Sequence, residues 1–354
     1  MKTRSMRRAL ALSSVTTDSP VVTKARPTGK KRKMSTAVAA ALLSDSSSKS
    51  SGVNALPVPS AATISSSPLS SPLLNIGPLT PGTILRRPSS IIRSPYVADV
   101  VLPDGSVILA HSPALDVGGL ASVDSKVLLS ERPPGGKTQY TIELVYCTGP
   151  ECGVSGEELV GANPRLGEKI AKKAIEQNLL GYGTESIREQ VTMNDSRVDF
   201  VLGEADGGQE HIIEVKNVVC ADYRAATAPE KKGKNHCVVS VDLPAEEYKR
   251  AGIFPWGRLG QEFKGEKVVS ERAIKHVRNL SKLCSKSGGG HRASVLFVVN
   301  RGDCEVMRAC HEQDEVFARE MKKAKESGVG VDAFRVRWTE EGEAWFDGVV
   351  PFIA

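Results

Sequence analysis

Residues 293–299, Ala-Ser-Val-Leu-Phe-Val-Val, constrain the fold more than any other part of the sequence. A run rich in β-branched and aromatic residues predicts a strand that is buried on both faces, as in sheets covered by helices. The expected helices lie on either side of it in the chain. One spans residues 270–286, with Ser270 as N-cap, and the other spans about 314–327. With a last strand at about 331–338, this order predicts a mixed sheet flanked by helices.

The sequence before residue 270 predicts one more helix and three more strands of the same α/β (α+β) body, which we place at residues 160–354. Apolar residues recur at helical spacing after Pro164, and Gly181-Tyr-Gly183 ends the pattern. The apolar positions of this helix are Leu166, Ile170, Ala174, Ile175 and Leu179. The three strands are expected at residues 186–191, 197–202 and 211–216.

Residues 79–150 predict a separate and smaller β domain. Two apolar runs flank a turn at Asp104-Gly105, which is a hairpin signal. Two further strands are expected at residues 126–129 and 140–146, with the loop Pro133-Pro-Gly-Gly136 between them. Several short strands over so short a span favour an OB-type barrel, a fold that often binds single-stranded nucleic acid. A structural docking role fits this segment equally well.

Residues 1–78 form a basic, Ser/Pro-rich leader that we predict to be disordered, because it lacks aromatic residues and any sustained periodicity. Its first 15 residues are rich in Arg and Ser and free of acids, which is typical of a mitochondrial or plastid transit segment. Lys30-Lys31-Arg32-Lys33 is instead typical of a nuclear import signal or a phosphate-binding arm. A solvated tail without an address is the third interpretation. We expect an intracellular protein.

The net charge of +6 divides unevenly along the chain. Residues 1–97 hold 14 Lys and Arg but only two acids, whereas the remaining 257 residues hold 33 bases and 39 acids. A body that is net negative can bind nucleic acid only through a local basic patch or a metal ion. The sequence has no run of 18 apolar residues, so we expect no membrane span.

The seven cysteines argue against a secreted disulfide framework, because they are few and odd in number in a chain of 354 residues. Cys147 and Cys152 lie five residues apart, and Cys304, Cys310 and His311 are irregularly spaced. Structural zinc sites ordinarily use pairs with C-x2-C-like spacing, so we do not expect a metal–thiolate site.

Candidate chemistry is concentrated on the strand His211-Ile-Ile-Glu-Val-Lys216 and on the strand before it. Side chains alternate between the two faces of a strand, so Glu214 and Lys216 share one face. Asp199 lies among apolar neighbours on the preceding strand and is expected on the same face. These ionisable groups need a reason, because the burial of charge on a central strand is costly.

The turn between these two strands decides which group Asp199 meets. If Asp206-Gly207 is the two-residue turn, Asp199 lies opposite Glu214, and two facing carboxylates repel each other unless a cation lies between them. If Gly207-Gly208 is the turn, Asp199 lies opposite Lys216 and the arrangement is a buried salt bridge. Both registers remain open at this point, and we favour the metal interpretation.

A divalent cation held by oxygen ligands is suited to phosphodiester hydrolysis, because it generates a hydroxide nucleophile and neutralises charge on the phosphate. Mg²⁺, or Mn²⁺ in its place, fits a site with few carboxylates. Lys216 would orient the attacking water or stabilise the oxyanion. Arg272 and His276, one turn apart on the predicted helix, are candidates for phosphate contacts, with an ordinary solvated helix face as the alternative.

Four sequence blocks follow one another along the body. They are Ser196-Arg-Val-Asp-Phe-Val-Leu202, Ile213-Glu-Val-Lys-Asn-Val218, Ser270-Glu-Arg-x-x-x-His276 and Arg292-Ala-x-Val-Leu-Phe-Val-Val-Asn-Arg301. Further blocks precede them at Tyr96–Gly105, Ala110-His111 and Tyr140–Val145. Together they resemble the sugar fermentation stimulation (SfsA) family, and the resemblance covers about residues 80–340.

The resemblance implies an N-terminal OB-type domain followed by a nuclease domain of the PD-(D/E)XK class, with a restriction-endonuclease-like mixed sheet. It also implies DNA as a partner, a proposed nuclease activity and an older link to the regulation of sugar metabolism; we add RNA as a further candidate substrate. By the family motif, Asp199 and Glu214 would be metal ligands and Lys216 the catalytic lysine.

An additional acid in this class often comes from the first helix. Glu168 is the candidate here, with Glu189 on the next strand as its rival. Arg301, which ends the fourth block, joins Arg272 and His276 as a candidate for nucleic-acid binding.

The sequence departs from the family pattern at about residues 222–269, where an apparent insertion carries Lys231, Lys232 and Lys234. These lysines would bind phosphate or simply lie in an exposed insertion. The family's turn after His111 is also replaced, which argues against a function of that OB loop. We expect a metal-dependent nuclease-like protein; a non-catalytic DNA-binding regulator is the alternative, and a metal-free protein-interaction module is the third class.

Overall fold

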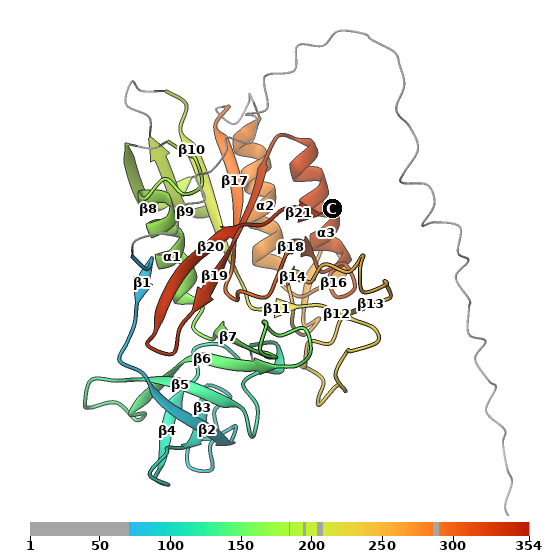
Figure 1. Cartoon of the computed structure of the whole chain (residues 1–354). Helices are drawn as coiled ribbons and strands as arrows, with labels where there is room; N and C mark the ends of the chain where they lie inside the picture. The colour runs from blue at the N-terminus through green and yellow to red at the C-terminus, as the bar shows by residue number, and fades with distance from the viewer. Residues whose placement is uncertain are drawn as a thin grey trace, which may run out of the picture. The chain divides into compact units, whose positions relative to one another are not determined.

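The computed structural model describes residues 71–353, apart from residues 116, 184, 194–195, 204–207 and 286–289. Most of the predicted leader lies outside the described residues, and so does most of the turn between the strands that carry Asp199 and Glu214. The described chain is a mixed α and β structure that is dominated by two sheets (Figure 1).

The larger sheet has seven strands in the order β1, β20, β19, β17, β10, β9, β8. The bounds are β1 Leu74–Asn75, β8 Ser186–Met193, β9 Ser196–Gly203, β10 His211–Val218, β17 Arg292–Val299, β19 Gly330–Trp338 and β20 Glu343–Val349. Strands β10, β17 and β19 run parallel to one another, and the outer pairs are antiparallel. The sheet is therefore mixed, as the sequence predicts.

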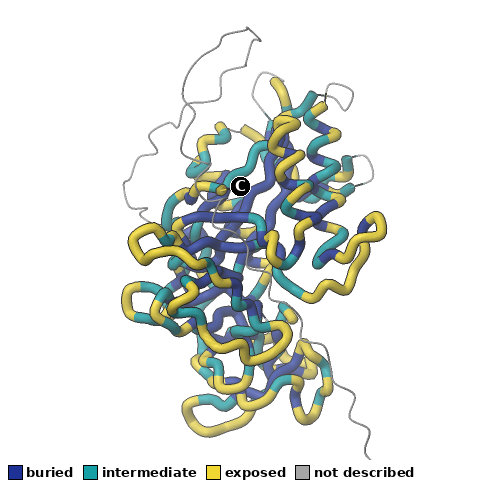
Figure 2. The backbone as a smooth tube through the Cα atoms, turned by 90° about the vertical axis from the view of Figure 1, so that its right-hand side faces the viewer, coloured by how far each residue is buried: buried dark blue, intermediate teal, exposed yellow. Residues whose placement is uncertain are grey.

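Helices cover both faces of this sheet. Helix α1 (Arg165–Glu176) packs on one face, while α2 (Glu271–Cys284) and α3 (Glu315–Glu326) pack on the other (Figure 1). Successive side chains of β17 enter the two cores alternately: Phe297 packs on the α2 and α3 side, and Val298 packs on the α1 side. This arrangement confirms the prediction of a strand buried on both faces, which Figure 2 shows as a buried centre.

Polar side chains cap the two later helices. The Ser270 hydroxyl accepts a hydrogen bond from the backbone N–H of Ala273 at 3.2 Å, which confirms Ser270 as the N-cap of α2. The Asp314 carboxylate does the same for the N–H of Phe317 at 2.8 Å in α3. Helix α1 ends at Glu176, earlier than predicted, and Leu179 follows it outside the helix.

The smaller sheet has six strands in the order β4, β3, β2, β5, β6, β7. Their bounds are β2 Thr80–Arg86, β3 Val97–Val101, β4 Val107–His111, β5 Lys126–Glu131, β6 Tyr140–Thr148 and β7 Glu157–Gly161. Strand β4 also pairs in parallel with β6, so the sheet closes on itself around a core of its own. The predicted hairpin at Asp104-Gly105 corresponds to β3 and β4.

The predicted insertion is built into a third, four-stranded sheet. Its strands, in the order β11, β14, β18, β21, are Cys220–Ala221, Ala251–Phe254, Val306–Ala309 and Phe352–Ile353. Two small pairs accompany it, β12 (Tyr223–Arg224) with β13 (Ser240–Val241) and β15 (Gln261–Phe263) with β16 (Glu266–Val268); a short 3-10 helix spans Val117–Gly119. Ala251 and Ile253 are buried, so this segment contributes to the fold.

The last residues of the predicted leader belong to the fold. Leu74 and Asn75 form β1, which pairs with Ala344 and Glu343 of β20, and the side chain of Leu73 is only 3% exposed. The prediction of a leader that extends to residue 78 is therefore too long, because a two-residue strand leaves no periodic signal. Among the described residues, the helices are too short and too polar to cross a membrane.

Candidate functional site

Strands β9 and β10 separate at the position of the predicted acidic pair. Their ladder joins Leu202 to His211, Val201 to Ile212 and Phe200 to Ile213, and it stops there. This is the register of the Asp206-Gly207 turn, in which the next opposed positions are Asp199 and Glu214. At this fork, where the pairing ends, Asp199 and Glu214 lie close enough for their charges to interact, and the Lys216 alternative does not occur.

Asp199 links β9 to β10 at the fork through a hydrogen bond to the backbone of β10. Its carboxylate oxygen Oδ2 accepts a hydrogen bond from the N–H of Val215 at 2.7 Å. This bond takes the place of a ladder bond beyond the end of the strand pairing. The side chain of Asp199 is thereby held beside Glu214, although the strand pairing does not extend this far.

Glu214 is the most densely contacted residue of the site. Its Oε1 atom accepts hydrogen bonds from the Lys216 ammonium at 2.5 Å and from Nδ1 of His276 on α2. The side chains of Lys216 and His276 are each about one-tenth exposed, and that of Glu214 is 3% exposed. The predicted acid–lysine pair on one face of β10 is therefore present and buried.

The helix α2 directs His276 at the acid rather than at solvent. The Arg272 guanidinium Nε–H donates to Nε2 of His276 at 3.3 Å, so the ring proton lies on Nδ1, which donates to Glu214. The sequence predicts a phosphate contact for His276. In the structure this side chain instead orients Glu214, while Arg272 remains exposed at the edge of the site.

Glu168 on α1 is linked to the site by Gln190 of β8. The Gln190 side-chain amide donates to Glu168 Oε2 at 2.9 Å and to Asp199 Oδ1 at 3.3 Å. The rival acid, Glu189, points elsewhere: its carboxylate pairs with Lys172 and its side chain is 48% exposed. The structure thus brings Glu168, and not Glu189, to Asp199.

Two backbone features bring these groups together. Gln190 has a positive φ of 54° inside β8, which redirects its side chain toward Asp199. Gly167 lets the start of α1 approach β10, because a Cβ atom there would lie 2.7 Å from Oδ1 of Asn217.

Sequence reasoning missed Gln190. A two-residue turn at residues 194–195 would have placed it opposite Asp199 on the β8–β9 hairpin, in the same register as the observed Val191–Val198 pair.

The two acids differ in their protonation. Burial, together with the neighbouring Glu214 carboxylate, raises the pKa of Asp199 to about 6. Burial also acts against ionisation of Glu214, but the charge of Lys216 and the hydrogen bond from His276 outweigh it and hold the pKa of Glu214 below its usual value. Glu214 is therefore the ionised member. Asp199 forms no ion pair with a described residue, and the charge of Lys216 only partly offsets the rise in its pKa.

The donor set suits a small hard cation. Asp199 and Glu214 offer carboxylate oxygens, and Mg²⁺ commonly binds one or two carboxylates and keeps several waters. Burial first, and then the charge of Glu214, raise the pKa of Asp199, and a bound cation would act against both effects. Within the described part of the chain, no group of three or more His, Cys, Asp and Glu side chains is placed to coordinate a metal ion. A cation at the fork would therefore keep several water ligands.

Arg301 does not belong to the candidate nucleic-acid-binding set, which corrects the prediction from sequence. Its side chain is only 2% exposed, and its guanidinium is bonded to Asp303 at 2.6 and 2.7 Å and to the carbonyl of Val219 at 3.0 Å. A buried guanidinium with these partners cannot reach a phosphate. The lysines of the predicted insertion, Lys231, Lys232 and Lys234, are exposed.

Comparison with known families matches the body of the chain. The model described as "Sugar fermentation stimulation protein RE domain" matches residues 165–254 and 267–342, which include α1, the fork and α2. A sugar fermentation stimulation protein homolog of Rhizobium meliloti is 29% identical over 266 residues, which cover 73% of this chain and 88% of that protein. The homolog of Geotalea uraniireducens is 28% identical over 270 residues, or 75% and 93% of the two chains.

A solved structure has the same fold. It is described as Pyrococcus furiosus SfsA in complex with Ca²⁺, and it aligns with a TM-score of 0.59 and 19% sequence identity over 80% of this chain and 100% of that one. The matched family model, the relatives and this structure agree with one another. The chain belongs to the sugar fermentation stimulation (SfsA) family.

Proposed function

We propose that this protein is a metal-dependent nuclease that hydrolyses phosphodiester bonds in DNA. The observation that carries the proposal is the fork between β9 and β10, where Asp199 and Glu214 face each other beside Lys216. The order Asp, then Glu-x-Lys on the next strand, with Glu168 on the preceding helix, is that of the PD-(D/E)XK nucleases.

Two further features support the proposal. The seven-stranded sheet between α1 and α2–α3 agrees with a restriction-endonuclease-like core. The smaller closed sheet has antiparallel neighbours except for β4 and β6, as in a five-stranded OB-type barrel, with β7 added at its edge. We assign residues 80–161, which end with β7, to the OB-type domain, and β1 together with residues 165–353 to the nuclease domain, so that the boundary lies later than the expected residues 150–160.

Each residue of the site would have its own role in binding or catalysis. Asp199 and Glu214 would hold Mg²⁺ or Mn²⁺, which supplies an activated water and charge neutralisation at the phosphate. Lys216 carries a positive charge beside this point and would steady the oxyanion. His276 fixes the rotamer of Glu214, and Arg272, exposed one turn away on α2, would bind a flanking phosphate.

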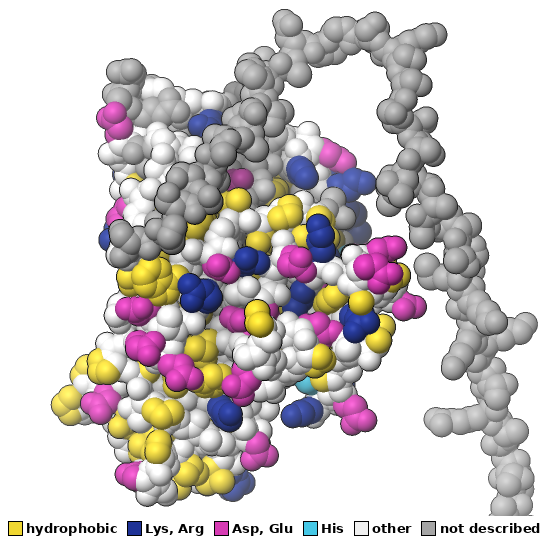
Figure 3. All heavy atoms as spheres, viewed as in Figure 1, with side chains coloured by type: hydrophobic (Ala, Val, Ile, Leu, Met, Phe, Trp, Pro, Cys, Tyr) yellow, Lys and Arg dark blue, Asp and Glu magenta, His cyan; other side chains and the backbone are white. Residues whose placement is uncertain are grey.

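The Ca²⁺ of the archaeal protein supports a metal site. That protein is described in complex with this ion, a hard divalent cation that takes oxygen ligands, as Mg²⁺ does. A bound metal ion would also allow the body, which is net negative, to bind DNA. On the face seen in Figure 3, Lys and Arg side chains are interspersed with Asp and Glu, so this face offers no broad basic surface to DNA.

A non-catalytic DNA-binding protein with a regulatory role in sugar metabolism is the second candidate. The ion pair between Lys216 and Glu214 favours it, because in this arrangement both groups are already satisfied by each other. The two candidates predict different outcomes when the lysine is removed.

The test is Mg²⁺- or Mn²⁺-dependent degradation of single- and double-stranded DNA, with RNA as a further substrate. Glu214→Gln and Lys216→Met should each lower the cleavage rate at least 100-fold, about 3 kcal/mol in the barrier, without a matching loss of DNA binding. Glu157→Gln, which removes an exposed acid paired with Lys126, is the matched control and should cleave normally. Binding without cleavage by the wild type would favour the second candidate.

A further inference from the structure

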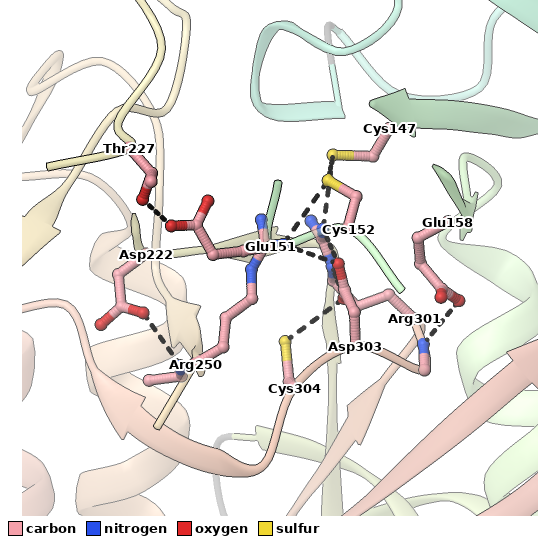
Figure 4. Close-up of polar contacts among 12 residues, drawn as sticks. Cys147, Glu151, Cys152, Glu158, Asp222, Thr227, Arg250, Arg301, Asp303 and Cys304 are labelled. Atoms are coloured by element: carbon pink, nitrogen blue, oxygen red, sulfur yellow. Dashed lines mark hydrogen bonds and ion pairs between the residues drawn. The ribbon is translucent and has the colours of Figure 1, made fainter. Parts of the chain in front are cut away.

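A buried cluster of charge lies outside the candidate active site, where the β6–β7 hairpin meets the segment after β17 (Figure 4). Arg301 binds Asp303 through Nε at 2.6 Å and through one terminal nitrogen at 2.7 Å. Arg250 binds the same carboxylate at 2.9 Å. The side chains of all three residues are at most 3% exposed.

The carboxylate of Asp303 cannot balance two guanidinium groups. Arginine stays protonated in proteins, so the three side chains carry a net charge of +1 in a buried place. The Nε and one terminal nitrogen of Arg250 also find no hydrogen-bond partner in the described part of the chain. An uncompensated buried charge is strongly destabilising, so a further anion is expected close to these groups.

The neighbouring carboxylates are turned toward other partners. Glu158 accepts a hydrogen bond from the N–H of Gly302, and burial raises the pKa of Glu158 to about 7. Glu151 binds the hydroxyl of Thr227 through Oε1, and its Oε2 has no hydrogen-bond partner among the described residues. Asp222 binds the Arg308 guanidinium at 3.0 Å.

Two sulfur atoms lie against the same guanidinium nitrogens that bind Asp303. The Sγ of Cys147 lies 3.4 Å from Arg301, and the Sγ of Cys152 lies 3.5 Å from Arg250. The two sulfur atoms are 3.0 Å apart and both residues are buried. One thiolate shared by this pair would bring the charge of the cluster to zero.

We propose that Cys147 and Cys152 are an oxidation site, a dithiol that hydrogen peroxide converts to a disulfide. Cys147 is the thiolate and Cys152 is the resolving thiol. The hydrogen bond from Cys152 and the charge of Arg301 lower the pKa of the Cys147 thiol despite its burial, while the same hydrogen bond raises the pKa of Cys152. This site does not depend on nuclease activity.

The reaction balances in two steps. The Cys147 thiolate attacks one oxygen of the peroxide, the O–O bond breaks, and the products are a sulfenic acid and hydroxide. The Cys152 thiol then attacks the sulfenic sulfur; the S–S bond forms and the oxygen leaves as water with the thiol proton. Two electrons pass from the pair of sulfur atoms to the peroxide.

The local structure allows the two sulfur atoms to come together and form the disulfide. Cys147 is fixed in the β6 ladder opposite Glu158, whereas Cys152 lies in the hairpin turn between β6 and β7, whose tip at Val154 is fully exposed. The sulfur atoms must approach by about 1 Å to reach the ~2.05 Å of a disulfide. Because both thiols are buried, the site selects a small oxidant over a bulky disulfide such as oxidised glutathione.

The experiment treats the reduced full-length chain with hydrogen peroxide, then denatures it, alkylates the free thiols and maps the cysteine peptides by mass. We expect Cys147 and Cys152 to be recovered as one linked pair, and the more exposed Cys284 to be alkylated. Recovery of both Cys147 and Cys152 as free thiols at peroxide levels that oxidise Cys284 would overturn the proposal. A mixed disulfide of glutathione with Cys147 would overturn the choice of a small oxidant.

Variants test the roles of the two thiols. Cys152→Ser should stop the reaction at the sulfenic acid, so that Cys147 becomes labelled by dimedone. Cys147→Ser should abolish labelling at Cys152, because no thiolate remains; equal labelling there would contradict the assignment. Cys284→Ser is the matched control and should form the Cys147–Cys152 disulfide at the wild-type rate. Since the wild-type mapping needs no variant, a variant that fails to fold leaves the test intact.

Discussion

Asp199 and Glu214 show how neighbouring groups decide the chemistry of two similar side chains. Both are buried carboxylates on one face of the fork. Glu214 gains the charge of Lys216 and a hydrogen bond from His276, whereas Asp199 has a backbone N–H and an amide as partners. The pKa values accordingly shift in opposite directions. Asp199 is the residue that a bound cation would stabilise most.

His211, at the start of β10, makes the stability of the protein depend on pH. One ring nitrogen, Nε2, bonds to the Ser294 hydroxyl at 2.8 Å, and the other, Nδ1, is buried without a hydrogen-bond partner among the residues that the structure describes. Burial and the charge of Arg292 lower the pKa of His211 to about 3, below its ordinary value of 6.5. The unfolded chain therefore binds this proton first, and stability that is present above pH 6.5 is lost as the pH falls toward 3.

We predict that the free energy of unfolding falls by about 2 kcal/mol between pH 6.5 and pH 5 through this residue. His211→Gln should lose that part of the pH dependence, as measured by urea unfolding at both pH values. His311→Gln, at an exposed histidine, is the control and should retain the wild-type slope. Equal slopes for wild type and His211→Gln would contradict the assignment.

Among the elements, those with a strong local pattern were predicted well. Strand β17 and helix α2 follow from a continuous apolar run and from a capped amphipathic stripe. Strand β2 was missed because Pro81 and Gly82 interrupt it, and β20 was missed because Gly348 and two acidic residues dilute its apolar content. Short strands of this kind depend on partners that are distant in the sequence.

The part of the site that was predicted correctly follows from the alternation of side chains along a single strand. Glu214 and Lys216 share a face because a strand has a period of two residues. The fork itself depends on where β9 leaves β10, which no local pattern encodes. Arg301 was assigned wrongly for the same reason: its burial comes from Cys147 and Val219, residues that are far away in the chain.

The close approach of α1 to β10 gives a prediction about Gly167. A Cβ at this position would lie 2.7 Å from Asn217 Oδ1, so Gly167→Ala should shift the start of α1 and Glu168 with it. We expect a loss of about 1–3 kcal/mol in unfolding free energy and a reduced Mg²⁺-dependent cleavage rate. Gly260→Ala is the control, because its added Cβ meets no atom closer than 3.9 Å. Wild-type stability and activity in Gly167→Ala would show that the helix tolerates the displacement.

Across the chain as a whole, most of the excess positive charge lies in one segment and the residues of the candidate site lie in another. Residues 1–70 carry 11 Lys and Arg against two acids, while the part that holds the fork is net negative. We propose that the leader contributes phosphate contacts or an organelle address. Both proposals can be tested by removing it.

Removal of residues 1–70 should weaken DNA binding and make its dependence on salt shallower, because fewer counterions are released. The measurement is DNA affinity of the full and shortened chains at several salt concentrations. An unchanged slope would limit the leader to a role in targeting, which the location of tagged full-length and shortened chains in cells would show. A shortened chain with the wild-type slope and the wild-type location would contradict both roles.

Anomalous diffraction from crystals grown with Mn²⁺ would locate the cation itself. We predict one strong peak at the fork, about 2.1 Å from a carboxylate oxygen of Asp199 and of Glu214, the range for a small hard cation. The peak should disappear in Asp199→Asn. Mn²⁺ bound elsewhere, with the Lys216–Glu214 ion pair intact and the fork free of metal, would contradict the account of this protein as a metal-dependent nuclease.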